Sequence, residues 1–254
     1  MNDEVLPNHI AILPNGNRTW ARQRGLHPSE GHKKGAEVLR EITRHMRNRG
    51  IHTATVWGAS TENFKTRSKE EMKNLVKLLD FVMENWAYEA DEDEARIVHI
   101  GRKDVLPKAV VKNLQYWENK TRHHTRHVLN IAFGYGGHDE IIRGFKKAYK
   151  DIQEGKITID DLAKTNGFYN GKYPYMKFKD YLDTGDQPYP FPDLIIRSAN
   201  ENRLSGFMPW QSVYAEIISV KKLNPEFTPE TIEECIKIFQ TRNRKFGGDD
   251  ENNQ

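Results

Sequence analysis

Two arginines and a serine form the most specific chemical pattern in the sequence. Arg197 ends the apolar run "DLIIR", and Arg203 and Ser205 follow it in a polar loop. The planar guanidinium group of arginine binds two phosphate oxygens at once, and a hydroxyl group adds a further hydrogen bond. This combination predicts a loop that binds a diphosphate.

The stretch "NGNRTW", residues 15–20, offers a second pattern suited to anion binding. Asn15 and Asn17 supply donors, Gly16 allows the backbone to approach a ligand closely, and Arg18 adds a positive charge. The stretch contains no carboxylate, although a loop whose ligand brings a metal ion usually has one. The alternative interpretation is an ordinary Asn-Gly turn with a solvated arginine.

Two further features place polar side chains beside apolar runs. Ser60 and Asn63 belong to "STEN", which suits either a substrate-contacting loop or the start of a helix. Glu216 lies inside the apolar run "YAEIISV". A carboxylate in such a strand is costly unless it binds a metal ion or pairs with an arginine, and both alternatives remain open.

The elements that must position these residues follow from the hydrophobic pattern. Short apolar runs alternate with segments of helical periodicity, which predicts an α/β fold with a mostly parallel sheet covered by helices. The predicted strands are 8–13, 52–57, 95–100, 127–133, 193–197 and 214–220. The predicted helices are 31–49, 68–89, 105–122, 138–154 and 228–245.

The polar stretches that follow the predicted strands belong at one edge of the sheet. Ligands bind outside the carboxyl ends of parallel strands. We therefore expect the four stretches that follow strand ends to converge: 14–20, 58–64, 134–139 and 197–205. The helix at 68–89 has an unusually broad apolar face, which suits core packing or the wall of an apolar cavity.

Two segments depart from the alternation. Residues 165–192 are rich in Tyr, Pro, Gly and Asp, and we expect a short helix or two within a long surface excursion whose aromatic residues need a packing partner. The polar residues 249–254 are expected to form a disordered tail after a single domain over residues 1–248.

Composition excludes several classes of protein. The net charge of +3 arises from 39 basic and 36 acidic residues, which is too balanced to indicate a nucleic-acid partner. No apolar run approaches the ~20 residues that span a bilayer. The amino terminus lacks a secretory signal, and the single cysteine, Cys235, cannot form an internal disulfide. A cytoplasmic location is expected.

Six segments together resemble the cis-prenyltransferase family, which includes undecaprenyl diphosphate synthases. They occur in the family's order and close to its spacing, over about residues 8–248. The segments are "GHKKG" (31–35), "STEN" (60–63), "NIAFGYGG" (130–137), "PDLIIR" (192–197), "RLSGFMPWQSVYAE" (203–216) and "RNRKFGG" (242–248). Each is weak alone, but the ordered set is specific.

The resemblance implies a fold, a reaction and a set of partners. The fold is a six-stranded, mostly parallel sheet surrounded by helices, with an apolar tunnel, usually in a homodimer. The reaction joins an allylic isoprenyl diphosphate to isopentenyl diphosphate. Magnesium normally assists, held by an aspartate of the opening loop and a glutamate from the partner subunit. Membrane contact is expected only through a lipid product.

The resemblance also assigns roles to individual residues. It places the allylic diphosphate on Gly16, Asn17, Arg18 and His32. It makes Asn15, Ser60, Asn63 and His32 the catalytic candidates. It places the second diphosphate on Arg197, Arg203 and Ser205, the metal ion on Glu216, and a tail that reaches the partner's active site at Arg244, Gly247 and Gly248.

The first diphosphate site departs from the family's pattern. Asn15 stands where the family has its metal-binding aspartate, and Arg18 stands where it has a glycine. Thr19 and Pro28 stand where it has arginines. The net change in charge over these four positions is zero, so the positive charge is moved rather than lost. Losing the carboxylate weakens a magnesium site, and Arg18 can neutralise leaving-group charge instead.

Three functions follow from this departure. The first is a short-chain or head-to-middle prenyltransferase of the lavandulyl type, which joins two C5 units. The second is an ordinary head-to-tail cis-polyprenyl diphosphate synthase with an altered loop. The third is a non-catalytic subunit of a heteromeric cis-prenyltransferase, although the retained Arg197 and Arg203 would then have no role.

Overall fold

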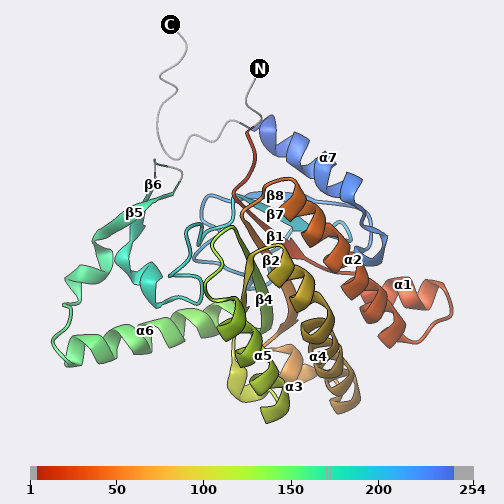
Figure 1. Cartoon of the computed structure of the whole chain (residues 1–254), viewed down its shortest axis with the longest axis horizontal. Coiled ribbons are helices and arrows are strands. Elements are labelled where there is room, and N and C mark those ends of the chain that lie inside the picture. The colour runs from red at the N-terminus through yellow and green to blue at the C-terminus, as the bar shows by residue number, and fades with distance from the viewer. Residues whose placement is uncertain (1–4, 170, 172, 243–254) are drawn as a thin grey trace, which may run out of the picture.

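The computed structural model describes residues 5–169, 171 and 173–242 of the chain. At its centre lies a six-stranded sheet in the order β3-β4-β2-β1-β7-β8, in which every neighbouring pair is parallel (Figure 1). The strands are β1 (His9–Leu13), β2 (Thr53–Ser60), β3 (Ala95–Ile100), β4 (His127–Tyr135), β7 (Leu194–Arg197) and β8 (Glu216–Ser219). All six predicted strands and the parallel sheet are confirmed.

The predicted helices are also present. They are α2 (Pro28–Asn48), α4 (Lys69–Glu92), α5 (Lys108–Thr121), α6 (Gly137–Gln153) and α7 (Pro229–Gln240). Ser68 caps α4 by accepting a hydrogen bond from the backbone N–H of Glu71 at 3.1 Å, as its sequence position predicts. The predicted end of the last helix, residues 243–245, lies outside the described residues.

Two short helices occur in the polar stretches. They are α1 (Asn17–Gln23), which was not predicted, and α3 (Asn63–Thr66), whose start was one of the two alternatives for "STEN"; neither has a side-chain cap. A helix of two turns carries too few apolar positions to reveal a period, so the hydrophobic pattern could not predict α1. The consequence for the site is that Arg18 lies on a helix.

The two faces of the sheet are covered differently. Apolar side chains of α2, α4, α5 and α7 form the larger core on one face, against Ile10 and Ile12 of β1. The alternate residues of β1, Ala11 and Leu13, point to a smaller cluster that contains Phe207 and Met208. The loop that follows β7 therefore covers part of the second face.

A buried polar chain crosses the middle of the sheet. His9 Nε2 lies 2.7 Å from Thr55 Oγ1, and Asn130 Nδ2 donates to the same hydroxyl at 3.0 Å. Asn130 and Gln187 exchange two hydrogen bonds of 3.0 and 2.7 Å. His9 and Asn130 are fully buried, so these contacts satisfy groups that water cannot reach.

Residues 165–192 contain strands as well as helical turns. An antiparallel hairpin of β5 (Thr165–Tyr169) and β6 (Tyr173–Met176) precedes the 3-10 helix η3 (Lys177–Tyr181). The expected short helix is present as η3, whereas the hairpin was not predicted, because a bulged hairpin of nine strand residues gives little alternation. Tyr169, Tyr175 and Phe191 form a buried aromatic cluster, which is the packing partner that the composition required.

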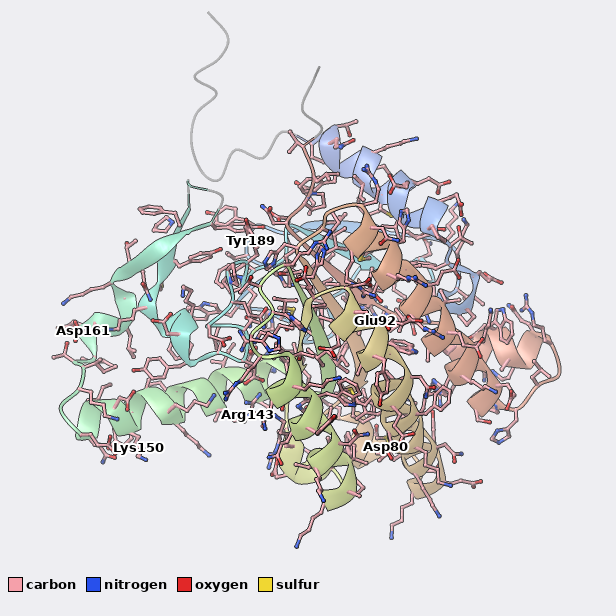
Figure 2. All side chains as sticks on the ribbon, viewed as in Figure 1. Asp80, Glu92, Arg143, Lys150, Asp161 and Tyr189 are labelled. Carbon is pink, nitrogen blue, oxygen red and sulfur yellow. The ribbon has the colours of Figure 1, made fainter. Side chains whose placement is uncertain are left out.

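The hairpin and α6 extend to one side of the sheet (Figure 1). Lys150 and Asp161 lie at the far end of this extension, whereas Arg143 lies at its base (Figure 2). None of the helices in the described ranges combines the length and apolar character needed to cross a bilayer. The expected tail, residues 249–254, lies outside the described residues.

Candidate active site

The four polar stretches converge at the carboxyl edge of the sheet, as predicted. The backbone N–H of Asn15 donates to Ser198 Oγ at 2.5 Å, which joins the first stretch to the fourth. The N–H of Thr61 donates to the carbonyl of Tyr135 at 3.2 Å, and the N–H of Gly137 donates to that of Gly206 at 2.8 Å. Polar groups distant in sequence thus share one surface.

Arg197 occupies the centre of the loop predicted to bind the second diphosphate. Its guanidinium group donates from both terminal nitrogens to Ser205 Oγ at 3.3 Å and also to the carbonyl of Arg203. Burial, and then the charge of Arg203, lower the pKa of Arg197, and the charge of Glu201 only partly opposes them. Its buried Nε has no hydrogen-bond partner among the described residues. The three predicted residues are therefore together, and the loop is short of negative charge.

The backbone of this loop is strained. Four residues other than glycine have positive φ angles: Ala199 at 65°, Asn200 at 55°, Ser205 at 51° and Met208 at 45°. Side chains with a Cβ rarely adopt this region, and each instance costs of order 1 kcal/mol or more. The surrounding structure must therefore hold the loop in place.

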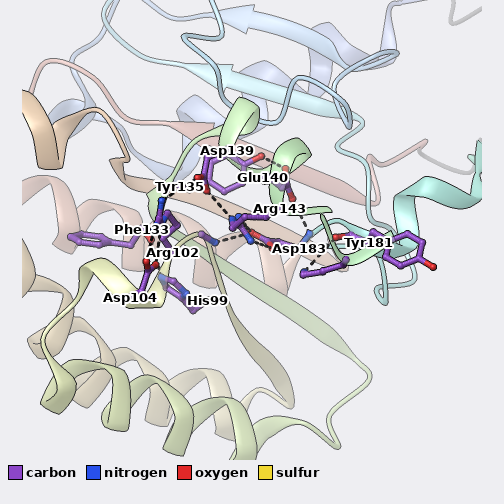
Figure 3. A network of polar contacts seen from close by, with 12 residues as sticks. His99, Arg102, Asp104, Phe133, Tyr135, Asp139, Glu140, Arg143, Tyr181 and Asp183 are labelled. Atoms are coloured by element: carbon purple, nitrogen blue, oxygen red, sulfur yellow. Dashed lines mark hydrogen bonds and ion pairs between the residues drawn. The ribbon is translucent and has the colours of Figure 1, made fainter. Parts of the chain in front are cut away.

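A network at the base of α6 holds the loop (Figure 3). Glu140 is 1% exposed and accepts hydrogen bonds from Tyr135 Oη at 2.5 Å and from Gln211 Nε2 at 3.0 and 3.1 Å. Asp183 donates its backbone N–H to Glu140 at 2.9 Å and receives two bonds from Arg143 at 2.6 and 2.7 Å. Burial and the nearby charge of Asp183 raise the pKa of Glu140.

The first diphosphate site contains a cluster of charged side chains on three helices. Arg18 of α1, His32 of α2 and Arg67 before α4 surround Glu71 of α4. They line or adjoin a cavity of about 560 Å³. Burial, and then repulsion by Arg67, lower the pKa of His32, so that this imidazole is neutral at neutral pH.

Asn17 and Gly16 have structural roles at this site. Asn17 Oδ1 accepts from Asn224 Nδ2 at 3.0 Å, and its Nδ2 lies 3.5 Å from His32 Nδ1. Gly16 has a φ angle of 87°, and a Cβ there would lie 2.6 Å from Leu223 Cδ2. Glycine is required at this position by the packing of Leu223, whether or not an anion is bound.

Ser60 and Asn63 contact each other's backbone. The N–H of Ser60 donates to Asn63 Oδ1 at 3.0 Å, and the N–H of Asn63 donates to Ser60 Oγ at 3.1 Å. These bonds form the turn that starts α3, which was the structural alternative for "STEN". Their role in catalysis stays a prediction.

An apolar cavity of about 80 Å³ lies behind the charged cluster, between α2, α4 and the sheet. His32, Leu75 and Leu78 line both this cavity and the larger charged one. Trp86 and Phe133 line it as well. The broad apolar face of α4 therefore serves both the core and a cavity wall, as its sequence predicted.

The magnesium ligands implied by the resemblance are not together in one chain. Glu216 begins β8 and is level with Leu194, at the opposite end of the sheet from Arg197 and Asn15. Within the described residues it pairs with Arg242, whose Nε lies 4.0 Å from Glu216 Oε2. In the described part of the chain, no three acidic, histidine or cysteine side chains form a metal-binding group.

Among the described residues, one carboxylate, that of Glu201, contacts Asn15. Glu201 Oε1 lies 3.5 Å from Asn15 Nδ2, and Glu201 also pairs with Arg203. An amide and a single, already paired carboxylate do not fit a magnesium site. The predicted tail residues Arg244, Gly247 and Gly248 lie outside the described residues.

Sequence reasoning missed three functional candidates. The sequence did not assign a role to Glu71, Glu140 or Glu201, because a partner of each comes from a distant segment of the chain. Gln211, the partner of Glu140, is 71 positions away. An acid three residues after the glycine pair 136–137 was the available signal for Glu140.

Known proteins match this chain over nearly its whole length. Residues 13–247 match the family described as "Putative undecaprenyl diphosphate synthase". An isoprenyl transferase from Clostridium tetani is 39% identical, with 96% of this chain and 90% of that protein covered. A farnesyl-diphosphate-specific undecaprenyl diphosphate synthase from Micrococcus luteus is 34% identical, with 98% and 92% covered.

The solved structures add a relative with a different product. Lavandulyl diphosphate synthase from Lavandula x intermedia, in complex with dimethylallyl diphosphate, superposes with a TM-score of 0.86 at 30% identity, covering 96% of this chain and all of that one. A probable undecaprenyl diphosphate synthase from Campylobacter jejuni gives 0.72 at 28% identity, covering 97% of this chain and all of that one. The chain is a prenyltransferase that belongs to the undecaprenyl diphosphate synthase family of cis-prenyltransferases.

Proposed function

We propose that this enzyme condenses an allylic isoprenyl diphosphate with a second C5 isoprenyl diphosphate to give a short product, of short-chain or lavandulyl (head-to-middle) type. The observation that carries the proposal is the size of the apolar cavity behind Arg18 and His32. It measures about 80 Å³. A protein cavity of about 150 Å³ accommodates benzene, which is about the size of a C5 group, so this cavity has no room for a long chain. It shares His32, Leu75 and Leu78 with the charged cavity, and we expect a C5 group to lie where the two cavities meet.

The two substrates are bound by two different groups of residues. The allylic diphosphate lies against Arg18, Arg67 and neutral His32, with its prenyl group in the apolar cavity. The C1–O bond breaks, and the positive side chains stabilise the charge that develops on the leaving diphosphate. The second diphosphate is held by Arg197, Arg203 and Ser205, which positions its double bond to attack C1. Loss of a proton completes the product.

We propose that magnesium assists this reaction less than in relatives with an aspartate at the position of Asn15. Arg18 supplies positive charge at that loop, and a neutral amide binds a hard cation weakly. The assay that tests the function incubates the purified chain with dimethylallyl diphosphate alone, then with isopentenyl diphosphate, each with and without magnesium. Products from dimethylallyl diphosphate alone are expected for head-to-middle chemistry.

The alternatives give different products. Pyrophosphate released only when isopentenyl diphosphate is added, with long products, would identify an ordinary head-to-tail polyprenyl diphosphate synthase. No turnover by the purified chain would identify a non-catalytic subunit. Trp86→Ala enlarges the apolar cavity and is expected to lengthen the product, whereas Trp210→Ala, far from that cavity in the aromatic cluster, is the matched control.

We propose a homodimer as the working form. Exposed apolar side chains support it: Val213 and Ile217 near Glu216 are 53% and 46% exposed, and Ile142 and Phe145 on α6 are 56% and 47% exposed. Sedimentation of the full chain tests it. A cytoplasmic location, the absence of a nucleic-acid partner and membrane contact only through a lipid product stay predictions.

A further inference from the structure

Glu71 occupies the centre of the positive cluster at the allylic site. Its Oε1 lies 2.9 Å from Arg67 and 3.5 Å from His32 Nε2, and its Oε2 lies 3.7 Å from Arg18. These partners come from three segments that lie side by side, α1, α2 and the start of α4 (Figure 1). One carboxylate thus neutralises the side chains that the proposed function assigns to a diphosphate.

A diphosphate and this carboxylate cannot share the same position. Both are anions, and two like charges a few ångströms apart repel strongly in a partly buried site. The Glu71 side chain is 20% exposed, against 53% for Arg18 and 23% for Arg67. It therefore lies deeper than Arg18 and at about the same depth as Arg67.

The structure allows Glu71 to move without moving the helix. Its backbone is fixed because its N–H donates to Ser68 Oγ at 3.1 Å. Its side chain lines the cavity of about 560 Å³, which leaves room for rotation to another rotamer. Ion pairs at this exposure contribute about 1 kcal/mol or less, so a ligand of higher charge can replace them.

We propose that Glu71 holds the place of the allylic diphosphate in the substrate-free enzyme and is displaced when the diphosphate binds. This inference rests on the proposed function, because it uses the same site. Displacement requires a ligand that pairs with Arg18 and Arg67 better than one carboxylate does. Glu71 thereby selects diphosphates over singly phosphorylated compounds and becomes a specificity-determining residue.

The test measures binding of inorganic diphosphate and of inorganic phosphate to the full chain by calorimetry, with a chelator present and, in a second series, with magnesium instead. Glu71→Gln removes the competing charge and keeps the size of the side chain. It is expected to bind diphosphate about tenfold more tightly than the wild type and to bind phosphate measurably. Its melting temperature without ligand is expected to fall by a few degrees, because the arginines lose their counter-ion.

Glu70→Gln is the matched control. Glu70 precedes Glu71 in the first turn of α4 and lines the same cavity, so its substitution makes the same change in net charge. Its expected effect on diphosphate affinity is less than twofold. Equal tightening by the two variants would overturn the inference in favour of a general charge effect.

Two further outcomes also decide the question. If Glu71→Gln binds diphosphate no better than the wild type, the inference is wrong. If it binds more weakly and only when magnesium is present, Glu71 is a metal ligand and the inference is again wrong. Turnover of dimethylallyl diphosphate by the wild type tests the proposed function separately, so failure of one leaves the other standing.

Discussion

The two predicted diphosphate sites are built in different ways. The second is a strained backbone loop that a buried network holds, and its residues Arg197, Arg203 and Ser205 are those that the resemblance assigns to a diphosphate. The first consists of side chains on α1, α2 and α4, with Arg18 53% exposed, and it departs from the family at several positions. Charged residues that are exposed on separate helices can be substituted without disturbing the fold. A strained backbone loop tolerates few substitutions, because its conformation depends on the residues that hold it.

The largest expected difference between the sites comes from removing one arginine from each. Arg197→Ala should lower kcat/KM about a thousandfold, because a buried guanidinium group makes several charge-assisted bonds to a diphosphate. Arg18→Ala should lower it about tenfold, because Arg67 remains and solvent screens the site. Steady-state kinetics with both substrates checks this. Equal losses would remove the distinction between the two sites.

The anchoring network gives the next largest effect. Glu140→Ala leaves the hydroxyl of Tyr135, the amide of Gln211 and a backbone N–H without their acceptor. The free energy of unfolding should fall by about 3 kcal/mol, measured by denaturant titration. Glu70→Ala, at the surface of the first site, should change it by less than 1 kcal/mol. A small change in the free energy of unfolding of Glu140→Ala would mean that the loop keeps its conformation without this network.

Acid should destabilise the central sheet, because the buried residue His9 lies in β1. Burial lowers the pKa of His9 to about 4, from an ordinary value of 6.5. A histidine that is harder to protonate when folded stabilises the fold fully above pH 6.5, and this contribution is lost as the pH falls toward 4. The loss should approach about 3 kcal/mol.

Variants at two histidines check this assignment. His9→Gln should flatten the dependence of unfolding free energy on pH between 6.5 and 4. His123→Gln, at an exposed position, should leave it unchanged. An unaltered slope in the His9 variant would assign the acid sensitivity to another group, such as His99, whose pKa burial also lowers to about 4.

The smallest expected effect concerns Asn15 and the metal requirement of the first site. Asn15→Asp restores the family's carboxylate, but it places that charge beside Glu201, 3.5 Å from the present amide. Activity without metal should fall about tenfold and magnesium should restore it. Titration of activity with magnesium measures this. An unchanged metal requirement would contradict our interpretation of Asn15.

Much of the fold could be predicted because its strands and long helices have strong hydrophobic patterns. The convergence of Asn15 with Ser198 followed from the rule for parallel sheets. The position of Glu71 could not be predicted, because it depends on how α4 is rotated against α2. The anchoring of the second loop by Glu140 and Gln211 depends on a contact across 71 positions, which local patterns do not contain.

The polar chain from His9 to Gln187 has a consequence for how the strands align. A parallel sheet buried on both faces has no alternation of polar and apolar residues to fix its register. If β1 slipped by one residue along β2, His9 would lie level with His52 or Ala54 instead of Thr53, and its ring would be about 3.3 Å out of place for the hydroxyl of Thr55. The hydrogen bond between these two buried side chains would be lost, which disfavours a misaligned pairing of β1 and β2 that apolar packing alone would tolerate.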